Sequence, residues 1–238
     1  MPRGFAQVVC HTNVDNRCVR ITCGDLDVAL FEWGRGEPLV LVHGLAEDHR
    51  AWRGVLPWLA LHRRVIAYDL RSHGETSLGT ADGTLAQLAG DLVTLLDAAG
   101  LERVDLCGFS LGGTIVLRVA IDHPDRVGRL VAVSTSSRVG RAAAAWYQER
   151  ATKADDAGVV NACRAMVRLG TEPLDPELRR IQAPTLVVAA ELDELCPPRA
   201  GAIVAAGIPG ARLRVLPRTG HDVPLERPQE LSHAVLAL

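Results

Sequence analysis

Residues 108–112 read Gly-Phe-Ser-Leu-Gly, which places Ser110 close to a glycine on either side. The pattern follows an apolar stretch, residues 104–107, and precedes a stretch of helical spacing, residues 111–121. A sharp strand-to-helix turn strains the serine backbone, exposes its Oγ and leaves no room for side chains at the glycines. The N–H of Leu111 would then face the reacting atoms from the helix N-terminus. The motif predicts a nucleophilic serine, and the alternative is a serine in a glycine-rich turn without a catalytic role.

A serine hydroxyl needs a base that accepts its proton, and the chain has eight histidines. His221 lies in a Thr-Gly-His-Asp segment after the last predicted strand, on a loop that would return to the C-terminal edge of a sheet. The other histidines lie in helical stretches, polar loops or the N-terminal region, except His43, which directly follows a core strand. We therefore predict His221 as the base and a structural role for His43.

The base in turn needs a carboxylate that fixes its tautomer and stabilises the imidazolium. Asp193 follows a continuously apolar strand and lies between Ser110 and His221 in the sequence. When a nucleophilic serine lies in a strand-to-helix turn, the three residues of its triad typically follow the order Ser, Asp, His along the chain. Glu191 and Glu194 are nearby rivals, for which a solvated position on the loop is the simpler interpretation.

A strand end followed by a turn also occurs at His43-Gly44-Leu45, after the apolar residues 39–42. The backbone N–H groups of Leu45 and Leu111 would form a two-donor site for an oxyanion. His43 would hold that loop through hydrogen bonds. Loss of one oxyanion donor would lower the rate about 10²–10³-fold.

The elements that must position these residues alternate between short apolar strands and helices. Strands are predicted at residues 19–22, 28–33, 39–42, 64–69, 104–108, 127–134, 185–190 and 212–216, and helices from 85 to about 100 and at 111–121, 141–156, 159–169 and 175–181. Such alternation predicts an α/β fold with a mostly parallel sheet covered on both faces. The stretch between the strands near 130 and 185 is longer than the roughly dozen residues of a simple crossover, which indicates an insertion over the ligand site.

The composition excludes several classes of protein. The chain of 238 residues is 48% hydrophobic, and its 26 basic and 28 acidic residues give a net charge of −2, which argues against a nucleic-acid partner. No apolar run reaches the ~20 residues of a membrane span, and residues 1–10 lack a signal-peptide pattern. We therefore expect a cytoplasmic protein without a membrane partner. Its six cysteines are expected to be reduced, with a Cys10–Cys18 pair as the alternative.

Five ordered motifs make the sequence from about residue 20 to the end resemble the α/β-hydrolase superfamily. They are His43-Gly44-Leu45, residues 69–74, the turn around Ser110, Asp193 before Pro197, and Gly220-His221. The resemblance implies an α/β-hydrolase fold with a Ser110–His221–Asp193 triad. It further implies an N-terminal extension at residues 1–18, a core at 19–137 and 183–238, and a helical cap at 138–182. Relatives with an aspartate nucleophile, such as haloalkane dehalogenases and epoxide hydrolases, are set aside because position 110 is serine.

Within the superfamily, residues 134–150 are similar to the cap entry of 3-oxoadipate enol-lactonases, in which an arginine and a tryptophan occupy positions like Arg138 and Trp146. A substrate carboxylate would suit Arg138 as a bidentate partner. The alternative is a solvated arginine, since only Lys153 among the 26 basic residues is a lysine. The residues after His221 depart from those lactonases. Phe109, Leu111, Tyr147 and Met166 are further candidate pocket walls, for which ordinary core packing is the alternative.

These patterns predict a serine hydrolase of small carboxylic esters or lactones that acts through an acyl-enzyme, with no metal or organic cofactor. A homodimer is compatible with the sequence. Two other activities remain open on the same triad: carbon–carbon bond hydrolysis and cofactor-free haloperoxidase chemistry. A ligand-binding receptor with slow turnover is the alternative from another class.

Overall fold

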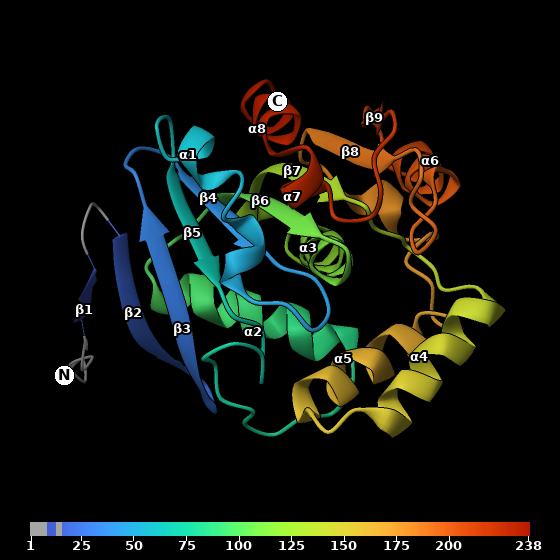
Figure 1. Ribbon diagram of the computed structural model, residues 1–238, viewed down its shortest axis with the longest axis horizontal. Coiled ribbons are helices and arrows are strands. Elements are labelled where there is room, and N and C mark those ends of the chain that lie inside the picture. Colours follow the sequence, from blue (N-terminus) through green and yellow to red (C-terminus); the bar gives the residue numbers. More distant parts are fainter. Residues whose placement is uncertain (1–8, 13–15) are drawn as a thin grey trace.

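The predicted sheet is present in a computed structural model, which describes residues 9–12 and 16–238 (Figure 1). Its nine strands are ordered β1-β2-β3-β5-β4-β6-β7-β8-β9. They are β1 (Val9–Thr12), β2 (Asn16–Cys23), β3 (Leu26–Trp33), β4 (Pro38–Val42), β5 (Arg64–Tyr68), β6 (Val104–Phe109), β7 (Val127–Val133), β8 (Thr185–Ala190) and β9 (Arg212–Leu216). β1, β2, β3 and β5 pair antiparallel, and every pairing from β5 through β4 to β9 is parallel. The predicted α/β fold with a mostly parallel sheet is confirmed.

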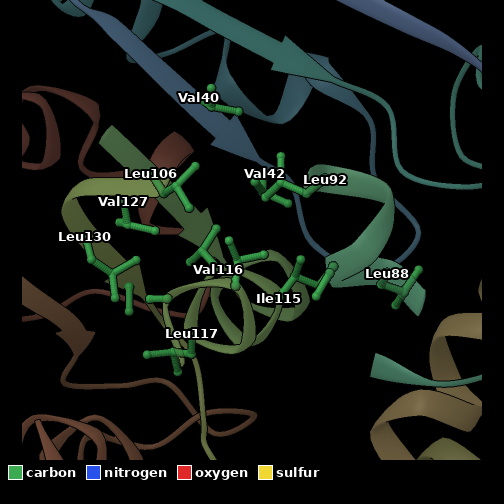
Figure 2. Packing of buried hydrophobic residues seen from close by; sticks show 14 of the residues in the cluster. Val40, Val42, Leu88, Leu92, Leu106, Ile115, Val116, Leu117, Val127 and Leu130 are labelled. Atoms are coloured by element: carbon green, nitrogen blue, oxygen red, sulfur yellow. The ribbon is translucent and has the colours of Figure 1, made fainter. Parts of the chain in front are cut away.

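The central strands are apolar throughout because helices cover both faces of the sheet. Val40 and Val42 of β4 face a core cluster that includes α2 (Leu85–Ala98) and α3 (Leu111–Asp122), as Figure 2 shows. Leu39 and Leu41 point to the other face, where they share a cluster with α8 (Pro228–Leu236) and the short α1 (Leu56–Leu59). β9 forms an edge of the sheet and is exposed along its first four residues.

The N-terminal boundary differs from the prediction. β2 begins at Asn16 rather than at residue 19, and β1 pairs with it, so part of the expected extension belongs to the sheet. Residues 1–8 and 13–15, the remainder of the stretch before residue 16, lie outside the described residues. The β1–β2 ladder places Cys10 opposite Cys18.

One predicted helix is wrong. Residues 175–181 contain only a short 3₁₀ turn, η3 (Leu178–Arg180). Pro176 lies within this stretch and Pro173 and Pro184 lie just outside it, and a proline lacks the N–H that an α-helix interior requires.

The two other helices predicted between β7 and β8 are present. α4 (Arg141–Lys153) and α5 (Ala157–Arg168) pack against each other beyond the ends of the strands (Figure 1). α5 contributes Ala162, Ala165 and Met166 to the core cluster, whereas α4 has no buried residue. The chain then continues through β8 into α6 (Pro198–Gly207), and α7 (Val223–Glu226) follows β9. Among the described helices, none is both long enough and apolar enough to cross a membrane.

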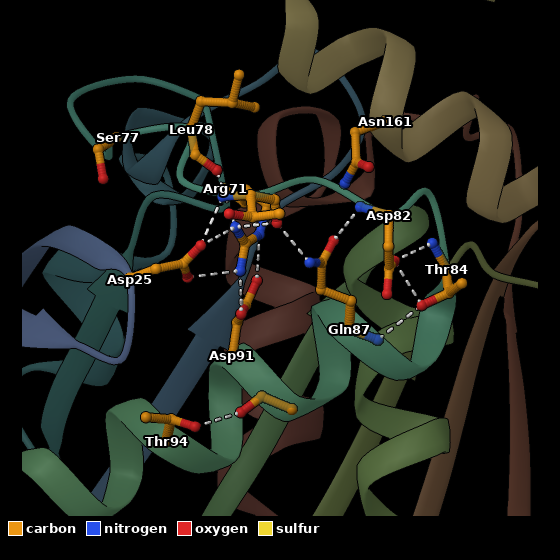
Figure 3. A network of polar contacts seen from close by, with 12 residues as sticks. Asp25, Arg71, Ser77, Leu78, Asp82, Thr84, Gln87, Asp91, Thr94 and Asn161 are labelled. Carbon is orange, nitrogen blue, oxygen red and sulfur yellow. Dashed lines mark hydrogen bonds and ion pairs between the residues drawn. The ribbon is translucent and has the colours of Figure 1, made fainter.

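A buried arginine fixes the loop that connects β5 to α2 (Figure 3). The Arg71 side chain is 3% exposed and donates to both carboxylate oxygens of Asp91, at 2.7 and 2.9 Å. It also donates to the carbonyl oxygens of Leu78 and Thr80, each at 2.8 Å, and makes longer contacts with Asp25. Because a buried guanidinium needs partners for its donors, this network determines the path of the loop.

Replacement of Arg71 by methionine is expected to lower the free energy of unfolding by about 3–5 kcal/mol, because it leaves the Asp91 carboxylate partly buried and unpaired. Arg20→Met is the matched control, because Arg20 is 35% exposed and lies 3.4 Å from each of two acidic partners. The control should lose about 1 kcal/mol or less. Urea denaturation of the two variants measures both values, and equal losses would contradict the role of the Arg71 network.

Candidate active site

Ser110 lies in the turn between β6 and α3, with φ 53° and ψ −117°. A side chain at Gly112 would overlap the carbonyl oxygen of Val42, and one at Gly108 would overlap that of Gly112. The two glycines are therefore required by the close approach of α3 to β4 and β6, as the sequence predicts.

Hydrogen bonds with β7 and with the residues just after it hold Ser110 in its left-handed backbone conformation. Its N–H donates to the carbonyl oxygen of Val133 at 2.9 Å, and its own carbonyl oxygen accepts the hydroxyl of Thr135 at 2.7 Å. A non-glycine residue with φ and ψ in this region costs about 1–3 kcal/mol, which the hydrogen bonds around it must offset.

His221 and Asp193 meet Ser110 at the carboxyl ends of the strands. The Nε2 of His221 lies 3.0 Å from the Ser110 Oγ, and its Nδ1 lies 2.8 Å from Asp193 Oδ2. A carboxylate only accepts, so Nδ1 carries the proton and Nε2 is free to accept from the serine hydroxyl. The structure thus brings together the three residues that the sequence selects.

The Asp193 carboxylate is fully buried, and its second oxygen is also satisfied. Oδ1 accepts the N–H groups of Leu195 at 2.9 Å and Cys196 at 2.8 Å. The two rival carboxylates do not contact the histidine in this way. Glu191 accepts the N–H of Arg218 at 2.7 Å, and Glu194 is an exposed residue at the rim of the cavity described below.

The loop after β4 is organised by His43, which is fully buried. Its Nδ1 donates to the carbonyl oxygen of Gly44 at 2.8 Å, and its Nε2 accepts the N–H of Leu70 at 2.9 Å, so the imidazole is neutral. The N–H of Gly44 donates to Glu47 Oε2 at 2.9 Å. Among the described residues, no hydrogen bond uses the N–H of Leu45 or Leu111, so both predicted oxyanion donors remain available.

A cavity of about 810 Å³ contains Ser110 and His221. Five of the six residues predicted as its walls line it, and the prediction is wrong for Leu111; the five are Phe109, Arg138, Trp146, Tyr147 and Met166. Leu45 lines it too, whereas the side chain of Leu111 is buried in the core. Sequence reasoning missed Glu47 and Arg150 as lining residues, and no local pattern distinguishes Arg150 from the other arginines of this chain.

The structure places Arg138 in the cavity wall but gives its guanidinium a partner. Arg138 forms an ion pair with Asp175, whose carboxylate also accepts the hydroxyl of Ser137. The Arg138 side chain is 55% exposed. It therefore reaches the cavity with its charge already matched by a protein carboxylate.

Burial sets the protonation of other groups in and near the cavity. It raises the pKa of the Cys196 thiol to about 12, with the Asp193 charge as the lesser cause, so this thiol stays protonated and is a poor nucleophile. Burial also raises the pKa of Glu47 and of Tyr147.

One cluster has side chains of the kind that bind metals. Donor atoms of Asp48, His49 and Asp69 lie within 4.8 Å of one another. Asp69 already accepts the ring Nδ1 of His49 and the backbone N–H groups of His49 and Glu75, at 2.7–2.9 Å. Asp48 is paired with Arg50. These bonds account for the cluster without an ion, and none of its three residues lines the Ser110 cavity.

A second cavity, of about 790 Å³, lies at the opposite ends of the strands. Arg63 in its wall is bonded to Asp105 and to the carbonyl oxygens of Glu37 and Pro38. Its lining contains no serine, and the Arg63 guanidinium in its wall is already bound by protein partners. The chemistry that the sequence predicts therefore belongs to the Ser110 cavity.

The chain is similar to known proteins both in sequence and in structure. The model of the family described as alpha/beta hydrolase fold matches residues 37–164. A solved enol-lactonase from Burkholderia xenovorans LB400 superposes with a TM-score of 0.81 at 25% identity, over 90% of this chain and 97% of that chain.

Two curated relatives come from Pseudomonas putida. The chain is 31% identical to a dihydrolipoyllysine-residue acetyltransferase component of an acetoin cleaving system, over 87% of this chain. It is 42% identical to a 2-hydroxy-6-oxo-2,4-heptadienoate hydrolase over 50% of this chain. The matches span 65% and 45% of the lengths of these two relatives.

The neutral state of His43 predicts a dependence of stability on pH. Burial, with the neighbouring His73 as the next cause, lowers the pKa of His43 from 6.5 to about 4. Between these two pH values the unfolded chain binds a proton that the folded chain does not. Stability is therefore highest above pH 6.5 and falls as the pH approaches 4, by about 3 kcal/mol for this group.

His43→Gln keeps an acceptor for the Leu70 N–H and removes this titration. The difference in unfolding free energy between wild type and variant, measured by urea denaturation from pH 7 to pH 4, should shrink as the pH falls. Other titrating groups are common to both proteins and cancel in the difference. A difference that stays constant over this range would contradict a depressed pKa at His43.

Proposed function

We propose, from the premise that the chain belongs to the alpha/beta hydrolase fold family, that it is a serine hydrolase of carboxylic esters or lactones. The observation that carries the proposal is the pair of hydrogen bonds through His221, at 3.0 Å to Ser110 and 2.8 Å to Asp193. This chain of bonds supplies a nucleophile, a base and a group that orients the base, which are the parts required for acyl transfer.

The proposed reaction begins when Ser110 Oγ attacks the substrate carbonyl and His221 Nε2 takes the hydroxyl proton. Asp193 stabilises the imidazolium, since its buried carboxylate already lies against Nδ1. The backbone N–H groups of Leu45 and Leu111 bind the oxyanion. His221 then gives its proton to the departing alcohol, and an acyl-enzyme remains on Ser110. Water, deprotonated by the same histidine, releases the acid.

Residues 138–182 are proposed as a cap over this centre. α4 contributes Trp146, Tyr147 and Arg150 to the cavity wall, and α5 contributes Met166. Because these side chains come from the insertion and not from the sheet, the cap determines the shape of the cavity while the sheet determines the position of the triad.

Ester or lactone cleavage is favoured by the similarity to the enol-lactonase, which extends over 90% of this chain. Carbon–carbon bond hydrolysis is the second candidate, because the relative with 42% identity is named a 2-hydroxy-6-oxo-2,4-heptadienoate hydrolase. That match covers only half of this chain, so it constrains the cavity less than the enol-lactonase does. Hydrolysis of a vinylogous diketone faster than any ester or lactone would favour the second candidate.

Ser110→Ala is expected to lower kcat for a 4-nitrophenyl ester by about 10⁴-fold or more, and Asp193→Asn by a similar factor. Ser136→Ala is the matched control, because Ser136 lines the same cavity and its hydroxyl donates to a backbone carbonyl. A fluorophosphonate probe should add its mass to the wild type and to Ser136→Ala, but not to Ser110→Ala. Wild-type turnover in Ser110→Ala would overturn the proposal.

A further inference from the structure

The Glu47 carboxylate lies in the cavity wall and takes no part in the reaction proposed above. The residue is partly buried, and its Oε2 accepts the backbone N–H of Gly44 at 2.9 Å. Among the described residues, no arginine, lysine or histidine forms an ion pair with this carboxylate. The contact that holds Glu47 is therefore a hydrogen bond to the loop after β4.

The charges around Glu47 support the same interpretation. Burial raises the pKa of Glu47, and the charges of Asp222 and Asp48 act in the same direction. The Gly44 N–H is the largest influence that lowers this pKa, ahead of His221. The hydrogen bond to the backbone thus offsets part of the cost of placing a carboxylate beside two other acids.

The loop between Gly44 and Glu47 is a tight turn with an unfavourable backbone. Its central residues are Leu45 and Ala46, and Ala46 has φ 61°. A positive φ at the third position of a turn favours glycine, so an alanine at this position must be held by other contacts. Glu47 supplies such a contact, because its side chain reaches back three residues and joins the last residue of the turn to the first.

An aromatic ring closes another side of Gly44. A Cβ atom at Gly44 would lie 2.6 Å from Glu47 Oε2 and 3.2 Å from two ring carbons of Phe109. The Phe109 ring in turn lies beside the imidazole of His221, with 5.1 Å between the ring centroids. Gly44 is therefore enclosed by the carboxylate and the ring, and the Leu45 N–H follows it directly in the chain.

We propose that Glu47 is a positioning residue for the oxyanion: by holding Gly44, it fixes the direction of the Leu45 N–H. This role requires a hydrogen-bond acceptor and not a charge, because the contact is made with a backbone N–H. The oxyanion is absent from the bound substrate, so a displaced donor lowers kcat and leaves KM unchanged. This inference rests on the proposed function and adds a residue to its site.

Two substitutions of similar length separate the acceptor from the charge. Glu47→Met removes both, and it should lower kcat for 4-nitrophenyl acetate about 10–100-fold, with KM within about threefold of the wild type. The loss is smaller than for a deleted donor, because the turn is displaced and the Leu45 N–H remains. Glu47→Gln removes only the charge, and it should keep kcat within about threefold, since its amide oxygen accepts the Gly44 N–H.

Glu194→Met is the matched control, because Glu194 is an exposed residue of the same cavity wall and its side chain makes no hydrogen bond among the described residues. Its kcat should stay within about threefold of the wild type. A loss equal to that of Glu47→Met would reduce the effect to the charge of the cavity and overturn the assignment. Equal losses in Glu47→Gln and Glu47→Met would overturn it too.

Thermal unfolding distinguishes the positioning of the turn from a general structural role. Glu47→Met and Glu47→Gln should melt within about 5 °C of each other. A larger difference, with the methionine variant the less stable, would show that Glu47 supports the fold and would overturn its assignment to the oxyanion. A rise in KM at unchanged kcat would overturn the assignment as well, because it would indicate a contact with the bound substrate.

An alkyl trifluoromethyl ketone probes the oxyanion directly. Ser110 Oγ adds to its carbonyl carbon, the hydroxyl proton passes to His221, and the carbonyl electron pair moves onto the oxygen, which leaves a bound oxyanion. The inhibition constant should therefore rise about 10–100-fold in Glu47→Met, in parallel with the loss of kcat, and little in Glu47→Gln.

The same ketone separates this inference from the proposed function. If the wild type hydrolyses the ester and binds the ketone, and Glu47→Met does both equally well, the role of Glu47 is refuted and the hydrolase proposal stands. If the wild type neither hydrolyses esters or lactones nor binds the ketone, the hydrolase proposal fails, and the role of Glu47 fails with it because there is no oxyanion to position.

Discussion

The close approach of α3 to the end of β4 constrains the whole candidate site. Because no side chain fits between Gly112 and the Val42 carbonyl, the helix can begin only one residue after Ser110, and Ser110 must adopt φ 53° to connect β6 with it. The same approach fixes where α3 begins, and with it the Leu111 N–H, which makes no hydrogen bond to the described residues. A looser contact would relieve the strain, but it would also move Ser110, the proposed nucleophile, together with the Leu111 N–H, a proposed oxyanion donor.

The parallel ladder extends this constraint to the rest of the triad. β6, β7, β8 and β9 are hydrogen-bonded in order, so the loops that follow them emerge at one edge. Asp193 follows β8 and His221 follows β9, and each is fixed by local backbone bonds: two N–H groups hold the Asp193 carboxylate, and the Leu192 N–H donates to the Thr219 carbonyl to tie the two loops. The geometry at His221 therefore depends both on the order of the strands and on the hydrogen bonds within and between these two loops.

The sequence predicted the three residues of the proposed triad because each has a local signal. Glycines flank Ser110, a continuously apolar strand precedes Asp193, and His221 lies on the loop after the last predicted strand. The prediction from sequence failed where the structure depends on prolines within a helical pattern or on a contact between residues far apart in the chain. The segment after α5 has helical spacing, but its prolines reduce it to one 3₁₀ turn. Arg138 and Arg150 look alike in the sequence, and only the folded chain shows that Asp175 neutralises the first, since this pairing joins residues on separate loops.

In the proposed division of the chain into core and cap, the core determines stability and the cap determines specificity. Gly112 is buried against the end of β4, so a substitution there disturbs β4, β6 and α3 at once. α4 has no buried residue and packs on α5, which carries the apolar face toward the core. A change at an exposed, cavity-lining position of α4 such as Trp146 therefore alters the cavity wall at little cost in core packing, since surface substitutions usually change stability by less than about 0.5 kcal/mol. α4 is thus the element on which we expect the cavity wall to change while Ser110, His221 and Asp193 stay in place.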